Sequence, residues 1–111
     1  MRRKFRLREE RRIREILRRG RGVGDSSLLI KSLPNEVGFN RFCFIVGKSV
    51  GKAVVRNRIR RLLREIAREL PLKKGYDFVV MAREEAAGRD YGDLKEVFRE
   101  LAKKGGFLEE A

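Results

Sequence analysis

Apolar residues recur at helical spacing in three segments of the chain, residues 8–19, 52–70 and 93–105. The apolar positions of the two shorter segments are Ile13, Ile16 and Leu17 in the first, and Leu94, Val97, Phe98 and Leu101 in the last. Glu9 and Glu10 lie in the first turn of the first segment, and Arg18 and Arg19 lie in its last turn. This arrangement of charges stabilises a helix through its dipole. In the last segment, Asp93 and Glu96 are spaced like a capping box at a helix start. These patterns predict three helices.

Three further segments are short, apolar and rich in β-branched or aromatic residues, which predicts strands at 27–33, 39–47 and 75–82. Between the first helix and the first strand, the glycine-rich stretch GRGVGDSS predicts a loop. The resulting order, αββαβα, is typical of a single-domain α+β sandwich in which helices pack against one sheet. The second and third strands can pair in parallel because a helix connects them.

The long helix at 52–70 is predicted to have an apolar side and an arginine-rich side. Its buried stripe is predicted to contain Val55, Ile59, Leu62, Ile66 and Leu70, flanked by Arg56 and Arg58 and with Leu63 at the edge. The opposite side carries Asn57, Arg60, Arg61, Arg64 and Arg68. Like charges four residues apart destabilise an isolated helix by about 0.2–0.5 kcal/mol per pair. A bound phosphate backbone would relieve this repulsion, and a solvated charged surface is the alternative.

The charge of the chain is large, positive and unevenly distributed. The 111 residues carry a formal net charge of +13. Residues 1–64 contain 20 basic and 5 acidic residues, whereas residues 65–111 contain 9 basic and 11 acidic residues. Arginine outnumbers lysine 20 to 9, and its guanidinium group binds phosphate with paired hydrogen bonds. This distribution predicts a polyanionic partner, with nucleic acid favoured over an anionic membrane. The alternative without a partner is a thermophile-like composition, which the absence of Thr and Gln would fit.

Several classes of function are excluded by what the sequence lacks. No apolar run is long enough for a transmembrane helix, and the basic N-terminus lacks the apolar region of a secretory signal. Cys43 has no second cysteine to pair with, and it is predicted to be a buried, unreactive thiol in a reducing cytoplasm. Histidine is absent, which excludes histidine-dependent triads and metal clusters. Asp77, inside an apolar segment, is interpreted as a strand-entry residue and not as a general base.

The arginine-rich segment GKAVVRNRIRRLLRE, at 51–65, resembles the signature of the bacterial ribonuclease P protein subunit. That signature has the form K-x-x-G-x-A-V-x-R-N-R-x-(K/R)-R. The chain supplies, in register, Lys48, Gly51, Ala53, Val54, Arg56, Asn57, Arg58, Arg60 and Arg61. The opening FRLREERRIREILRRG resembles the start of the family, with Arg6, Leu7 and Gly20 in place, and GYDFVVMAR resembles the strand after the signature helix. The resemblance covers nearly the whole chain.

The resemblance implies a fold and a division of labour. The family fold is an α+β sandwich of order αβββαβα, like the second domain of ribosomal protein S5, with one central sheet and a left-handed βαβ crossover through the long helix. One more strand is therefore expected, near residues 36–50. The implied partners are the ribonuclease P RNA subunit and precursor tRNA, with no membrane and no obligate protein partner. The RNA, with bound Mg²⁺, removes the 5′ leader; the protein contributes binding, and no catalytic residue or metal site is assigned to it.

The resemblance also implies two RNA-binding sites. The first faces the RNA subunit and consists of Lys48, Lys52, Arg56, Asn57, Arg58, Arg60, Arg61 and Arg64. The second is a cleft between the sheet and the first helix that holds the single-stranded leader, and its candidates are Ile13, Leu17, Phe42 and Phe44. Family members often have aromatic residues where this chain has Ile13 and Leu17. Base stacking would then move to Phe42, Phe44 or Phe5. The alternative is that Ile13 and Leu17 are core residues.

Two other functions stay open at the level of the sequence. A ribosomal or general RNA-binding protein would carry a similar basic helix, but it would copurify with ribosomes and not with one large structured RNA. A DNA-binding protein could place the helix in a major groove, although no helix-turn-helix partner precedes it.

Overall fold

The computed structural model describes residues 1–109. Their secondary-structure elements are α1 (Glu10–Arg19), β1 (Arg21–Gly24), β2 (Leu28–Pro34), β3 (Arg41–Val46), α2 (Ala53–Glu69), β4 (Tyr76–Ala82) and α3 (Tyr91–Lys104). Short 3-10 turns precede the three helices, at Arg3–Phe5, Lys48–Val50 and Glu84–Gly88. This order, αβββαβα, confirms the α+β class and the element order that the family resemblance implies. None of the helices in this range is long and apolar enough to cross a membrane.

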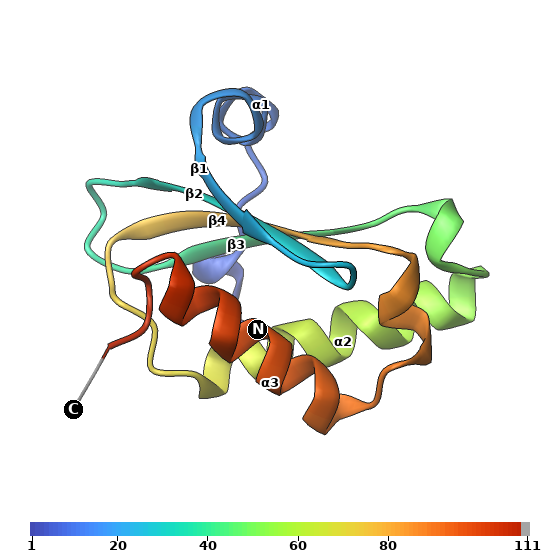
Figure 1. Ribbon diagram of the computed structural model, residues 1–111. Coiled ribbons are helices and arrows are strands. Elements are labelled where there is room, and N and C mark those ends of the chain that lie inside the picture. Colours follow the sequence, from blue (N-terminus) through green and yellow to red (C-terminus); the bar gives the residue numbers. More distant parts are fainter. Residues whose placement is uncertain (110–111) are drawn as a thin grey trace.

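One mixed sheet lies at the centre of the described residues, with its four strands in the order β1-β2-β4-β3. β2 pairs antiparallel with both β1 and β4, whereas β3 pairs parallel with β4. A parallel pair needs a crossover connection, which α2 supplies. The predicted parallel pairing across the long helix is therefore confirmed. Figure 1 shows that α1 lies over one face of the sheet, while α2 and α3 cover the other.

The sheet divides the core into two parts because successive strand residues point to opposite faces. On β4, Phe78 and Val80 belong to the part beneath α2 and α3, whereas Val79 belongs to the part beneath α1. In the larger part, the rings of Phe42 and Phe78 stack with their centroids 5.2 Å apart. The fully enclosed residues of the smaller part are Leu7, Ile16 and Val79. This smaller part has fewer buried residues than the larger one, so polar contacts between α1 and the sheet add to the attachment of α1.

The additional strand lies at β1, inside the predicted glycine-rich loop, and the expectation of a strand near residues 36–50 is wrong. Most residues of β1 are exposed, so no apolar alternation marks it in the sequence. It is a strand because it pairs with β2, with Val23 opposite Ile30. Tertiary pairing, and not local propensity, therefore determines this element.

The structure corrects one detail in each of two predicted helices. On α2, Leu63 is fully buried and Leu62 only partly, because α2 packs against both β3 and α3 and its contact surface is wider than one stripe. The buried residues along and just beyond α2 are Ile59, Leu63, Ile66, Ala67 and Leu70. The N-cap of α3 is Asp90, whose carboxylate accepts a hydrogen bond from the backbone N–H of Asp93 at 2.8 Å. The predicted capping role of Asp93 is therefore wrong, because the helix begins earlier and Asp93 lies in its first turn.

Candidate nucleic-acid interface

A tight turn before α2 determines where the arginine-rich helix begins. Gly51 has a φ of 156°, and a Cβ atom at this position would lie 3.1 Å from the side chain of Val55. Any larger residue would therefore be strained here. The exposed side chains of Lys48 and Lys52 lie on either side of this glycine. The turn thus brings two lysines to the N-terminal end of α2, where the helix dipole already favours anions.

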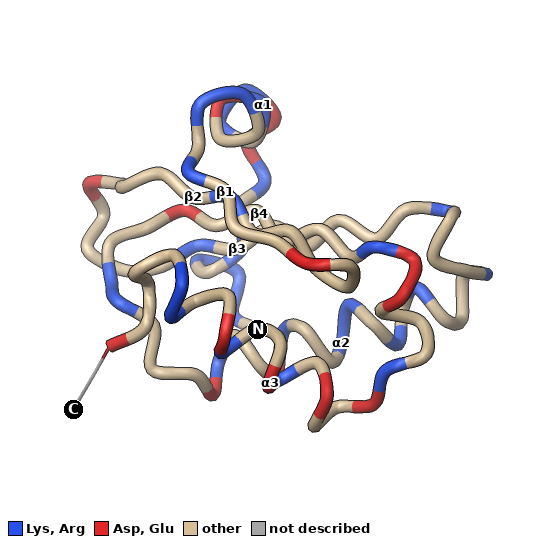
Figure 2. The backbone as a smooth tube through the Cα atoms, viewed as in Figure 1, with Lys and Arg blue, Asp and Glu red and all other residues tan. Residues whose placement is uncertain are grey.

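Basic residues outnumber acidic ones along α1 and α2, whereas α3 and the segment before it carry both signs of charge more evenly (Figure 2). On α2, Asn57 and Arg61 are exposed. The partly buried predicted RNA-binding residues are Arg56, Arg58, Arg60 and Arg64. Together with Lys48 and Lys52, the predicted residues form a band along one helix and its leading turn, and not a single pocket.

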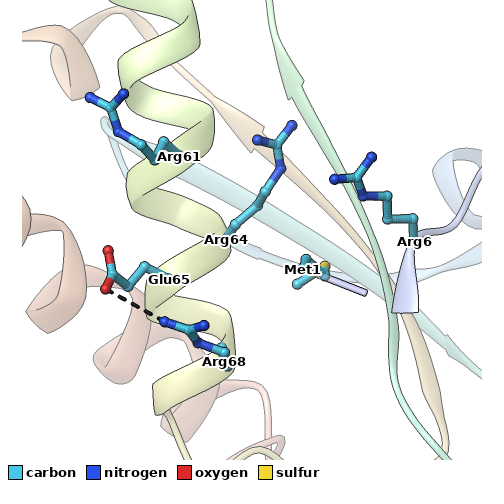
Figure 3. Close-up of a pocket in the computed structure, with 6 residues that line it drawn as sticks. All are labelled: Met1, Arg6, Arg61, Arg64, Glu65 and Arg68. Carbon is cyan, nitrogen blue, oxygen red and sulfur yellow. Dashed lines mark ion pairs between the residues drawn. The ribbon is translucent and has the colours of Figure 1, made fainter. Parts of the chain in front are cut away.

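A cavity of about 230 Å³ lies where α2 approaches the N-terminal segment (Figure 3). It is lined by Met1, Arg6, Arg61, Arg64, Glu65 and Arg68. Burial, together with the nearby charges of Arg6 and Arg60, lowers the pKa of Arg64. Glu65 pairs with Arg68 at 3.6 Å, and within residues 1–109 no carboxylate pairs with the other three arginines. Figure 3 shows that Arg6 and Arg64 point toward one another, and two neighbouring guanidinium groups are suited to bind phosphate.

Two arginines of the signature also hold α2 in place. Arg58 donates a hydrogen bond from Nη2 to the backbone carbonyl of Arg89 at 3.1 Å. Arg60 donates to the backbone carbonyl of Val46 at 3.3 Å and to Oδ1 of Asn57 at 3.0 Å. A guanidinium group has five N–H donors, so both side chains retain donors for a ligand. Each of these two side chains can therefore both hold α2 in place and bind a ligand.

The structure places the four predicted cleft residues on opposite faces of the sheet. Ile13 and Leu17 are partly buried on the α1 side, whereas Phe42 and Phe44 belong to the larger core, with ring centroids 5.8 Å apart. The separation follows from the alternation of side chains along β3, whose even-numbered residues face α2. The partly buried residues that accompany Ile13 and Leu17 are Leu33, Cys43, Ile45 and Met81. The structure therefore does not bring Phe42 and Phe44 to the α1 side.

Cys43 lies partly buried beneath α1. The predicted full burial of Cys43 is therefore wrong, but the partial burial raises the pKa of its thiol, which favours the protonated, poorly nucleophilic form. Among residues 1–109 there is no group of three or more His, Cys, Asp or Glu side chains that could hold a metal ion.

Asp77 is fully buried at the start of β4 and binds side chains from three other segments. Its carboxylate accepts two hydrogen bonds of 2.8 Å from Arg41, one of 2.8 Å from Arg12 on α1, and one of 2.9 Å from Asn35. Burial by itself would raise the pKa of Asp77, but these hydrogen bonds outweigh it and hold the pKa below its usual value. Asp77 thus stands at a strand start, as predicted, and also attaches α1 to the sheet.

A model of the ribonuclease P family matches residues 1–106 of the chain. The chain belongs to the ribonuclease P protein family. It is 36% identical over 104 residues to the ribonuclease P protein component of Clostridium botulinum (strain Langeland), covering 90% of this chain and 93% of that protein. The protein component of C. botulinum strain 657 is 35% identical over 103 residues, with the same coverage.

Solved structures of ribonuclease P proteins have the same fold. The Staphylococcus aureus protein superimposes with a TM-score of 0.85 at 22% identity, covering 95% of this chain and 98% of that one. The Thermotoga maritima protein gives a TM-score of 0.81 at 27% identity, again covering 95% and 98%. These matches confirm the single α+β domain with a four-stranded mixed sheet and three helices.

In this ribonuclease P protein, the structure adds two residues to the predicted basic band. Arg6 and Arg68 line the cavity beside Arg61 and Arg64. The spacing places Arg68 on the arginine-rich side of the long helix, but the predicted binding residues do not include it. Arg6 is one of the positions shared with the opening of the family, which is the sequence signal that could have identified it.

Proposed function

We propose that this protein is the cytoplasmic protein component of ribonuclease P, and that it binds the catalytic RNA subunit and the 5′ leader of precursor tRNA. The observation that carries this proposal is that Arg6 and Arg64 point toward one another at a cavity that Arg61 also lines, with no paired carboxylate for these three arginines among the described residues. Membership of the ribonuclease P family supports the same function.

The band along α2 is the surface that binds the RNA subunit. It consists of Lys48, Lys52, Arg56, Asn57, Arg58, Arg60, Arg61 and Arg64. Each lysine or arginine that contacts a phosphate releases condensed counterions, so the affinity falls as salt rises. The side-chain amide of Asn57 offers both a donor and an acceptor, which can bind a base edge or a ribose hydroxyl.

In this proposal, the leader of precursor tRNA binds in a groove where α1 lies against the sheet. Ile13 and Leu17 are only partly buried there, so both retain apolar surface for a base. Exposed arginines on the same helix, at Arg11, Arg14 and Arg18, supply phosphate contacts. Aliphatic side chains pack against a base without π-stacking, so the base contacts are weaker than those of an aromatic groove.

The RNA subunit carries the chemistry in this proposal. Mg²⁺ held by that RNA would activate the attacking water and stabilise the leaving oxygen. The residues of this chain bind the RNA subunit and the leader. They hold the two in a fixed relative position and neutralise part of their phosphate charge. Neutralising phosphates near the reacting bond reduces the magnesium concentration that the RNA needs.

Cleavage of precursor tRNA by a bacterial ribonuclease P RNA at low magnesium tests this function. Adding the protein should raise the cleavage rate, and the protein by itself should cut nothing. Polylysine of equal total charge is the control for non-specific neutralisation, and it should stimulate less. Site-specific maturation of the 5′ end by RNA-free protein would contradict the assignment of the chemistry to RNA. Absence of stimulation would contradict the assignment of the protein to ribonuclease P.

Replacing both Arg61 and Arg64 with alanine is expected to weaken binding to the RNA subunit about tenfold or more, because two charged phosphate contacts are lost. The slope of log affinity against log salt should fall by about 0.7–0.9 for each lost contact. Arg61 and Arg64 test RNA binding more cleanly than Arg58 and Arg60, because the latter two also hold α2 in place. Filter binding over a salt series measures both quantities.

The matched control for this pair is Arg99→Ala, an exposed arginine on α3. It removes the same side chain from the nearly neutral part of the protein, and it should leave both the affinity and the salt slope unchanged. Equal losses per removed charge in Arg99→Ala and in the double variant would show that total charge, and not the α2 surface, determines binding.

A further inference from the structure

A second and larger hollow lies beside the arginine cavity, between the N-terminal segment, residues 38–40 and the C-terminal end of α2. Its volume is about 650 Å³. Met1 and Arg68 line both this hollow and the arginine cavity, so the two are neighbours on one surface. The N-terminal segment is fixed there by β3, because the N–H of Leu7 donates to the carbonyl of Phe42 at 2.8 Å. One side of the hollow is therefore attached to the sheet through the backbone.

Aromatic rings form the apolar part of this hollow. The rings of Phe5 and Phe39 meet edge to face, with centroids 5.6 Å apart and an interplanar angle of 80°. Both are only partly buried, whereas Phe42, which also lines the hollow, is buried. The Nζ atom of Lys4 lies 5.0 Å from the centroid of each exposed ring. Two accessible ring surfaces with a cation over them are unlike ordinary core packing.

The rim of the hollow is positively charged. Its basic residues are Arg2, Lys4, Arg68 and Lys74, all of which are exposed, and none of the described residues that line it is acidic. An apolar floor with a purely basic rim matches a ligand that has a flat apolar part joined to an anion. Within nucleic acids, an unpaired nucleotide has that combination, since its base stacks on aromatic rings and its phosphate binds lysine or arginine.

We propose that this hollow binds one unpaired nucleotide of RNA, with the base against Phe39 and Phe5 and the phosphate between Lys4 and Arg68. The exposed ammonium group of Lys4 moves from the rings to the phosphate as the base takes its place. This site is separate from the groove beneath α1 and extends the α2 surface toward the N-terminus. The inference rests on the proposed binding of the RNA subunit and precursor tRNA, and it adds a base contact to what is otherwise phosphate recognition.

Phe39→Leu and Arg68→Ala test the two halves of this site separately. Phe39→Leu retains apolar volume and removes the aromatic ring, so it should lower the RNA affinity about tenfold, within the range measured for loss of one base–aromatic stack, and leave the salt slope unchanged. Arg68→Ala should lower the affinity and reduce the salt slope by about 0.7–0.9. Val37→Ala, an exposed residue just before Phe39 that does not line the hollow, is the matched control and should bind like the wild type.

Two binding measurements identify the source of the nucleotide. Loss of affinity of Phe39→Leu for the RNA subunit alone would assign the nucleotide to that RNA. Loss only in the ratio of precursor to mature tRNA bound by the assembled complex would assign it to the leader. Wild-type values in both measurements, with a melting temperature equal to that of Val37→Ala, would overturn the proposal. In that case normal stimulation of cleavage by the wild-type protein would leave the proposed function intact.

Discussion

Replacing Asp77 with asparagine is expected to destabilise the protein by about 3 kcal/mol, at the lower end of the range for breaking a buried ion pair. The carboxylate of Asp77 is fully buried, and the substitution leaves two guanidinium groups facing a neutral amide. The side chains of Arg12 and Arg41 are 19% and 30% exposed to solvent. Water can therefore hydrate their charges and reduce the cost of losing the carboxylate. Thermal unfolding at pH 7 should show a melting temperature lower by roughly 10–20 °C.

The same substitution should change how stability depends on pH. The pKa of Asp77 is lower in the folded state than in the unfolded chain, so its contribution is fully present above the unfolded value, near about 4. The contribution is lost as the pH falls through the folded pKa. The difference in melting temperature between wild type and Asp77→Asn should therefore be constant at neutral pH and shrink below about pH 4.

Glu15→Gln is the matched control for Asp77→Asn. Glu15 also pairs with Arg12, at 2.8 Å, but its side chain is 33% exposed, whereas that of Asp77 is fully buried. Removing the charge of Glu15 should lower the melting temperature much less than Asp77→Asn does, because solvent weakens a partly exposed ion pair. Equal melting temperatures for Asp77→Asn and Glu15→Gln would show that the buried carboxylate does not attach α1 to the sheet.

Elements with a strong hydrophobic period could be predicted from the sequence, and elements defined by their partners could not. The three helices and the apolar strands β2, β3 and β4 follow from apolar spacing and composition. The glycine-rich sequence around β1 predicts a loop, and only the pairing of these mostly exposed residues with β2 makes them a strand. The hand of the crossover through α2 stays a prediction of the family resemblance.

The candidate site shows the same limit. Spacing along α2 was enough to place its arginines on one side, because an isolated helix fixes which residues share a face. The sequence could not show that Arg6 meets Arg64, or that Arg12 and Asn35 meet at Asp77, since these contacts join segments far apart in the chain. The alternation of β3 was available in the sequence, and it would have separated Phe42 and Phe44 from the α1 side.

Two neighbouring residues of α1 are expected to separate stability from leader binding. Ile16 is fully buried against Leu7 and Val79, so Ile16→Ala should cost about 2–5 kcal/mol of stability and lower the melting temperature strongly. Leu17 is only partly buried, so Leu17→Ala should shift the melting temperature less. In the proposed groove it should weaken binding of precursor tRNA while leaving mature tRNA nearly unaffected, because only the precursor carries a leader.

The ratio of precursor to mature tRNA affinity, measured with the assembled ribonuclease P, decides the role of this groove. Ile13→Phe supplies an aromatic ring at a partly buried position and should raise the ratio, because base–aromatic stacking contributes about 1–3 kcal/mol. Leu17→Ala should lower the ratio, measured at a temperature where Leu17→Ala and Ile13→Phe are both folded. If Leu17→Ala instead melts as early as Ile16→Ala and keeps the wild-type ratio, then Ile13 and Leu17 are core residues, and the leader must bind elsewhere on the protein.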